Sequence, residues 1–136
     1  MKYITIGVKA DNIQQLEDVI TEEKIALNIK VLEEKYRVQI DFDDLREEFR
    51  KMGEFLKENN LEDENPFFRE FDINPYGLIM DFNFRGIETP EEMYPIISII
   101  AQAISKLLTT SCIFMTNDMR DPIALYENGS IIKQWR

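Results

Sequence analysis

The chain has 136 residues, of which 44% are hydrophobic and 31% charged, and its 16 basic and 26 acidic side chains give a formal net charge of −10. This length favours a single domain, residues 1–136, and the composition is that of a globular protein and not of a disordered one. A surface this negative repels nucleic acid and anionic membranes, so we expect neither as a partner and expect a basic protein or a cationic ligand instead.

The N-terminal part of the chain predicts a strand followed by helices. The alternation of a half-buried strand is formed by Ile4, Ile6 and Val8. Asp11 can then cap a helix, and the pattern leaves open whether 11–37 holds one helix or two. A short extended piece at 39–43 precedes another helix, with Asp43 as its expected cap. The apolar stripe of that helix consists of Leu45, Phe49, Met52 and Leu56.

From residue 67 onward, turn-forming residues at short intervals indicate a sheet. Strands at 69–73 and 78–84 flank the turn sequence Asn74-Pro75-Tyr76-Gly77, which predicts a hairpin. A further strand is expected at 112–116. In the strand at 78–84, one face should meet the most apolar helix of the chain, and that face consists of Leu78, Met80, Phe82 and Phe84.

The most apolar run, at 89–108, predicts the helix on which the rest of the fold packs. Thr89 offers an N-cap, Pro90 suits the first helical position and Glu92 completes a capping box. Pro95 lacks an N–H, so the main helix can also begin near this residue. Apolar residues cover more than half of the circumference, which requires burial on several sides, while polar interruptions leave the run too short to cross a membrane.

The final hairpin is predicted by Asn128-Gly129 between two apolar runs. A two-residue turn sets four cross-strand pairs, namely Glu127 with Ser130, Tyr126 with Ile131, Leu125 with Ile132, and Ala124 with Lys133. Tyr126, Ile131 and Trp135 then share one face. Either the N-terminal helices cover this face, or the three side chains form an exposed patch of the kind that binds partners.

The predicted fold class is therefore α+β. We expect a mostly antiparallel sheet of about five to six strands, packed against a central apolar helix at about 89–109, with a helical hairpin in the N-terminal half. Neither half of the chain has enough apolar residues for a core of its own, which favours a single domain.

Catalytic groups are scarce in this sequence. Histidine is absent, which removes the commonest general base near neutral pH and most zinc sites. Cys112 lies among apolar neighbours, so we expect a buried strand residue and not a nucleophile. As the only cysteine it cannot form an internal disulfide, and the N-terminus does not resemble a secretion signal. We predict a cytoplasmic protein that is not an enzyme.

The carboxylates give no specific sign of a metal or cofactor site. Asp41, Asp43 and Asp44 alternate like the start of a calcium loop, but the twelfth position counted from Asp41 is Met52, where such a loop needs glutamate. Helix capping explains these aspartates better. Paired carboxylates for hydrolysis could come from Asp81, Glu88, Asp118 and Asp121, as in any acidic domain. The five glycines form no phosphate-binding loop.

Most of the negative charge lies in residues 1–64, which hold 17 acidic and 10 basic side chains. One acidic cluster consists of Asp41, Asp43, Asp44, Glu47 and Glu48. Arg46, Arg50, Lys51 and Lys57 should neutralise it in part through neighbours three or four positions apart. A second cluster without nearby bases consists of Glu62, Asp63 and Glu64. Together with Tyr126, Ile131 and Trp135, these clusters form the predicted partner-binding residues.

The small size, the acidity, the α+β layout and the ending 123–135, IALYENGSIIKQW, after a long apolar helix resemble the small acidic immunity proteins of bacterial polymorphic toxin systems. The resemblance implies a cytoplasmic inhibitor that binds one toxin domain, often a basic nuclease, and blocks its active site or an adjacent surface. It supplies no binding residues that can be transferred to this chain.

Four hypotheses follow for the function. The first is stoichiometric binding of a basic toxin domain through an acidic surface, with aromatic anchors to slow dissociation. The second is a small-ligand-binding or regulatory α+β domain with a pocket between the sheet and the central helix. The third is an enzyme that uses aspartates alone. The fourth is a homodimer that forms through Tyr126, Ile131 and Trp135 or through a free sheet edge.

Overall fold

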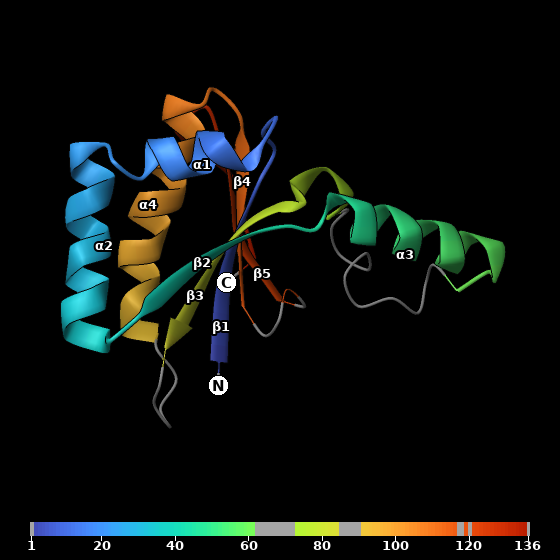
Figure 1. Ribbon diagram of the computed structural model, residues 1–136, viewed down its shortest axis with the longest axis horizontal. Coiled ribbons are helices and arrows are strands. Elements are labelled where there is room, and N and C mark those ends of the chain that lie inside the picture. Colours follow the sequence, from blue (N-terminus) through green and yellow to red (C-terminus); the bar gives the residue numbers. More distant parts are fainter. Residues whose placement is uncertain (1, 62–72, 85–90, 117–118, 120, 136) are drawn as a thin grey trace.

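Six antiparallel strands form one sheet in the order β2-β3-β1-β4-β5-β6 (Figure 1). The computed structural model describes residues 2–61, 73–84, 91–116, 119 and 121–135. The strands are β1 (Lys2–Val8), β2 (Gln39–Asp44), β3 (Leu78–Phe84), β4 (Ser111–Thr116), β5 (Asp121–Glu127) and β6 (Ser130–Gln134). The helices are α1 (Ile13–Val19), α2 (Glu23–Tyr36), α3 (Arg46–Glu58) and α4 (Tyr94–Leu107), with 3-10 turns η2 (Asn74–Tyr76) and η3 (Glu91–Met93). The α+β class with an antiparallel sheet is confirmed.

The main hydrophobic core lies between one face of the sheet and the helices α2 and α4, which run side by side (Figure 1). In β3, the face predicted to meet the central helix does so, because Leu78, Met80, Phe82 and Phe84 all belong to this core. The α4 side chains in the core include Ile97, Ile100 and Ile104. None of the described helices is long and apolar enough to cross a membrane.

The helix ends differ from several expectations. The region 11–37 holds two helices, and the cap of α1 is Asn12, which forms a capping box with Gln15, and not Asp11. Helix α3 follows Leu45 and has no side-chain cap, so the assignment of Asp43 as its cap was wrong. The neighbouring Asp44 accepts a hydrogen bond from the Arg46 N–H instead, at 3.1 Å.

Helix α4 begins later than the capping signal at Thr89 predicted. Its N-cap is Met93 and Pro95 lies in its first turn, in agreement with the alternative start near Pro95. Thr89 and Pro90 lie outside the described residues, as do residues 69–72 of the predicted hairpin with 78–84. Glu92, which was expected to complete the capping box three residues after Thr89, accepts a hydrogen bond from the Tyr36 hydroxyl at 3.3 Å. Within the described residues β3 pairs with β1 and β2.

A second, smaller core covers part of the opposite face of the sheet. Its buried members are Phe49, Ile73, Tyr76, Ile79, Ile113 and Met115. This core anchors the first turn of α3, because Phe49 lies in it and the Leu45 N–H donates to the Gly77 carbonyl at 2.8 Å. Beyond this anchor, α3 extends away from the sheet and the other helices (Figure 1).

The final hairpin forms at Asn128-Gly129, but a β-bulge shifts half of its predicted register. Glu127 pairs with Ser130 and Tyr126 with Ile131 as predicted, whereas Leu125 pairs with Lys133 and Ala124 with Gln134. The extra residue moves Trp135 to the opposite face, where it packs against the smaller core. The prediction that Tyr126, Ile131 and Trp135 share one face was therefore wrong.

Candidate protein-binding surface

Strand β2 is one edge of the sheet and carries the first three predicted acidic residues. Ile40 and Phe42 pack against the main core. Asp41 and Asp43 alternate with them and therefore point to the opposite face, where both are exposed. Charged side chains on an edge strand oppose pairing with another sheet. The two aspartates thus have a structural role, and they also contribute negative potential to the surface.

Asp44, the last residue of β2, is neutralised locally. Its Oδ2 lies 2.8 Å from Arg46 Nη2, and the Arg46 backbone N–H also donates to it. These side-chain and backbone hydrogen bonds from Arg46 lower the pKa of Asp44. Arg46 Nη1 also donates to the Asp11 carbonyl at 2.8 Å, which ties the start of α3 to the loop before α1. This ion pair fixes the β2–α3 junction and adds little net charge.

Glu47 is neutralised in the same way along one side of α3. Arg50 binds it with Nη2 at 2.5 Å and binds Glu54 with Nη1 at 2.6 Å. The hydrogen bond from Arg50 lowers the pKa of Glu47. All three side chains are largely exposed, so the ladder contributes only marginally to stability. The ion pairs of Arg50 have the predicted spacing of three or four residues, whereas Arg46 pairs with Asp44 two residues away, and Lys51 and Lys57 form no ion pair among the described residues.

The α3 flank, which we define as Glu48, Met52, Phe55 and Glu58, is the side of α3 that combines acidic side chains with exposed apolar groups. Phe55 is 58% exposed and Met52 36%. Glu58 lies three residues after Phe55 and adjoins it on the helix surface, while Glu48 lies four residues before Met52, so the four side chains follow one side of the helix. Among the described residues, no ion pair involves Glu48 or Glu58.

Sequence reasoning included Glu48 but missed Met52 and Phe55 as binding residues. Met52 was assigned to the apolar stripe with Leu45, Phe49 and Leu56. Phe55 lies beside that stripe, and an aromatic residue out of phase with a buried stripe was the available signal. The second acidic cluster, Glu62, Asp63 and Glu64, lies outside the described residues.

The other predicted partner-binding residues, Tyr126, Ile131 and Trp135, differ in burial and in the face of the sheet that they occupy. Tyr126 is buried in the main core under α4, Ile131 is 49% exposed on β6, and Trp135 is partly buried on the other face. Because β2 and β6 are the two edges of the sheet, five strand spacings, or about 24 Å, separate them. The predicted residues therefore do not form one surface.

A row of polar side chains crosses the face of the sheet opposite α2 and α4. Asp41 and Asp81 are directly paired across β2 and β3. The Thr5 hydroxyl donates to Asp81 Oδ1 at 2.8 Å, and Asn83 Nδ2 donates to Asp41 Oδ2 at 2.6 Å. Asn83 Oδ1 is buried and accepts no hydrogen bond from the part of the chain that the structure describes. The row brings together two carboxylates, a hydroxyl and an amide.

The other candidate catalytic residues among the described ones are Asp121 and Cys112. Asp121 begins β5, three strands from Asp81 and thus at least about 14 Å away, while Glu88 and Asp118 lie outside the described residues. Cys112 is fully buried, and burial raises the pKa of its thiol. The described residues include no group of three or more acidic or cysteine side chains that could hold a metal ion.

Comparison of the chain with protein-family models, with curated proteins and with solved structures gave no match.

Proposed function

We propose that the chain is a non-catalytic protein-binding module, and that it acts as an immunity protein that neutralises a basic toxin domain. The proposed contact is the α3 flank, supported by the exposed carboxylates of β2. The observation that carries the proposal is the exposure of Phe55 on a protruding helix, between Glu48 and Glu58, whose carboxylates form no ion pair among the described residues.

The carboxylates and Phe55 would contribute to different steps of partner binding. Carboxylates attract lysines and arginines of a basic partner over about a Debye length and so raise the association rate. Phe55 can enter a pocket of the partner at low entropic cost, and aromatic anchors of this kind slow dissociation. The formal net charge of −10 acts in the same direction.

A capture experiment in the native host tests this proposal. The wild-type chain, the Phe55→Ala variant and an Ile131→Ala control are used as baits, and bound proteins are identified by mass spectrometry. We expect a basic protein that the wild type and the control retain and that Phe55→Ala loses. Co-expression with the captured protein should then protect cells from its toxicity. A partner retained by all three baits, or one without toxicity, would contradict the proposal.

Homodimerisation is a second hypothesis with its own support. Strand β6 is the other edge of the sheet, all of its residues are exposed, and Ile131 and Ile132 are apolar. Unlike β2, this edge carries no acidic residue. Light scattering of the wild type and of Ile132→Lys distinguishes a monomer from a dimer formed through β6, because such a dimer should dissociate in the variant.

A further inference from the structure

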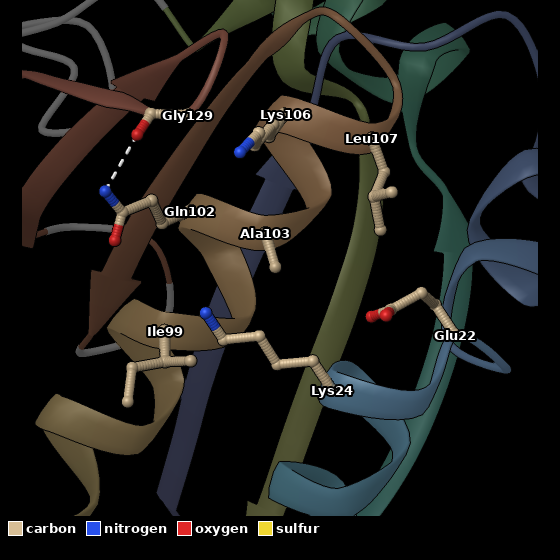
Figure 2. A pocket seen from close by; sticks show the side chains of 8 residues that line it. All are labelled: Glu22, Lys24, Ile99, Gln102, Ala103, Lys106, Leu107 and Gly129. Atoms are coloured by element: carbon tan, nitrogen blue, oxygen red, sulfur yellow. Dashed lines mark hydrogen bonds between the residues drawn. The ribbon is translucent and has the colours of Figure 1, made fainter.

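A hollow of about 360 Å³ lies on the outer side of α4, between this helix, the first turn of α2 and the turn that joins β5 to β6 (Figure 2). Its volume falls within the range of small-molecule sites. The hollow is separate from the α3 flank, and it does not lie between α4 and the sheet.

The floor of the hollow is an apolar stripe of α4. Ile99, Ala103 and Leu107 follow one another at intervals of four residues and so lie on one side of the helix. Ile99 is 37% exposed and Leu107 49%, so the fold leaves this stripe uncovered. An alkyl chain placed here would bury apolar surface on both sides of the contact.

Two lysines border this floor. Lys24 extends from α2 toward α4 and, like Ile99, lines the hollow (Figure 2). Lys106 lies two turns further along α4, about 10 Å from the level of Ile99. Among the described residues neither lysine belongs to an ion pair, although acidic side chains outnumber basic ones in this chain.

The other polar groups of the hollow are already engaged. The Glu22 carboxylate caps α2 by accepting the Ile25 N–H at 3.2 Å. Gln102 Nε2 donates to the Gly129 carbonyl at 2.8 Å, and Ser105 Oγ accepts the Gly129 N–H at 3.0 Å. These bonds fix the β5–β6 turn to α4, so that the wall is preformed. Glu22 keeps its negative charge, and together with Lys24 and Lys106 it leaves the lining of the hollow with a net charge of +1.

We propose that this hollow binds a small amphipathic anion, with its alkyl chain on Ile99, Ala103 and Leu107 and its carboxylate on Lys24 or Lys106. Medium-chain monocarboxylates have this chemistry. The positive charge of the lysines favours an anion over a cation, and the apolar floor favours a ligand with an alkyl chain. The site is independent of the proposed toxin-binding surface, because it involves none of the residues of the α3 flank.

Titration of the full chain with butanoate, hexanoate and octanoate, followed by the chemical shifts of backbone amides, tests this site. We expect saturable shifts at α4 and the start of α2, with the dissociation constant falling up to about fourfold for each added methylene. Octylammonium, which has the same chain but the opposite charge, should not bind. Equal binding of octylammonium, or no saturable shift with octanoate at millimolar concentration, would overturn the proposal.

Three variants and one control locate the binding. Lys24→Met and Lys106→Met keep the alkyl stems and should each weaken octanoate binding about two- to fivefold, as expected for an exposed ion pair. Ala103→Phe should block the floor and abolish binding. Lys51→Met on α3 is the matched control and should leave the affinity unchanged. Shifts that persist in Ala103→Phe, or an equal loss in Lys51→Met, would show that octanoate binds elsewhere.

Discussion

Asp41 and Asp81 lie directly opposite each other on β2 and β3, and each carboxylate is held by a different neighbour, Asn83 for Asp41 and Thr5 for Asp81. Like charges in directly paired positions of a sheet destabilise it. The hydrogen bonds orient the two carboxylates but do not remove their repulsion. We therefore expect that removal of one of the two charges stabilises the fold.

The first prediction concerns this pair. Asp41→Asn keeps an acceptor for Asn83 and removes the repulsion, so the free energy of unfolding should rise by about 0.2–1 kcal/mol. Urea denaturation at neutral pH measures the change. Asp43→Asn is the control, because Asp43 faces the apolar Ile79 across the strands. An equal gain in both variants would show that only the net charge matters.

The second prediction concerns the anchor of α3. A Cβ at Gly77 would lie 2.7 Å from Arg46 Cγ and 2.8 Å from Arg46 Cα, so Gly77→Ala must displace the start of the helix. We expect a loss of about 1–3 kcal/mol in the free energy of unfolding. At Gly53, within α3, an added Cβ meets only Asn74 Nδ2 at 3.5 Å. Gly53→Ala should therefore stabilise the protein by up to about 1 kcal/mol, because alanine favours the helix. Destabilisation of similar size in both variants would contradict this account of the anchor.

The third prediction concerns pH. Because Arg46 lowers the pKa of Asp44, the folded chain takes up this proton at lower pH than the unfolded chain, whose aspartates titrate near about 3.9. The ion pair thus stabilises the fold above that value, and the contribution disappears as pH falls through the folded pKa. NMR titration should show the Asp44 midpoint below the ordinary value in the wild type and a higher midpoint in Arg46→Met. Identical midpoints would contradict the pairing.

The fourth prediction concerns Cys112, which is fully buried and has a raised thiol pKa because of that burial. A thiol-specific disulfide reagent at mildly alkaline pH should react with the native protein more than about 10³-fold more slowly than with the chain in urea, because reaction requires opening of the core. Absorbance of the released thiolate measures both rates. Rapid labelling of the native protein would show that β4 is accessible to solvent.

Local patterns predicted most of the elements. Alternation identified β1, the Asn128-Gly129 pair identified the last turn, and the apolar run identified α4. The bulge at the last hairpin was not predictable, because the two-residue turn specifies only the nearest pairs. The start of α4 at Tyr94 was predictable from Pro95, and the error came from giving the Thr89 capping signal more weight.

The site was predicted less well because it depends on contacts between distant parts of the chain. The junction of β2 and α3 is local, so the ion pairs of Arg50 followed from a spacing of three or four residues, while Arg46 pairs with Asp44 only two residues away. Strand order is not local, and it places β2 and β6 at opposite edges of the sheet, so the aspartates of β2 are separated from Ile131 of β6. Phe55 was missed because its exposure depends on how α3 extends from the sheet.

The most direct test of the proposed function is the rate at which the chain associates with its captured basic partner, measured by stopped-flow at several ionic strengths. The proposal predicts that the association rate of the wild type falls about tenfold or more as salt screens the carboxylates. It also predicts that Phe55→Ala raises the dissociation rate about 30-fold, as expected for a central aromatic anchor, while Ile131→Ala does not. An association rate independent of ionic strength, or a faster dissociation in Ile131→Ala but not in Phe55→Ala, would contradict it.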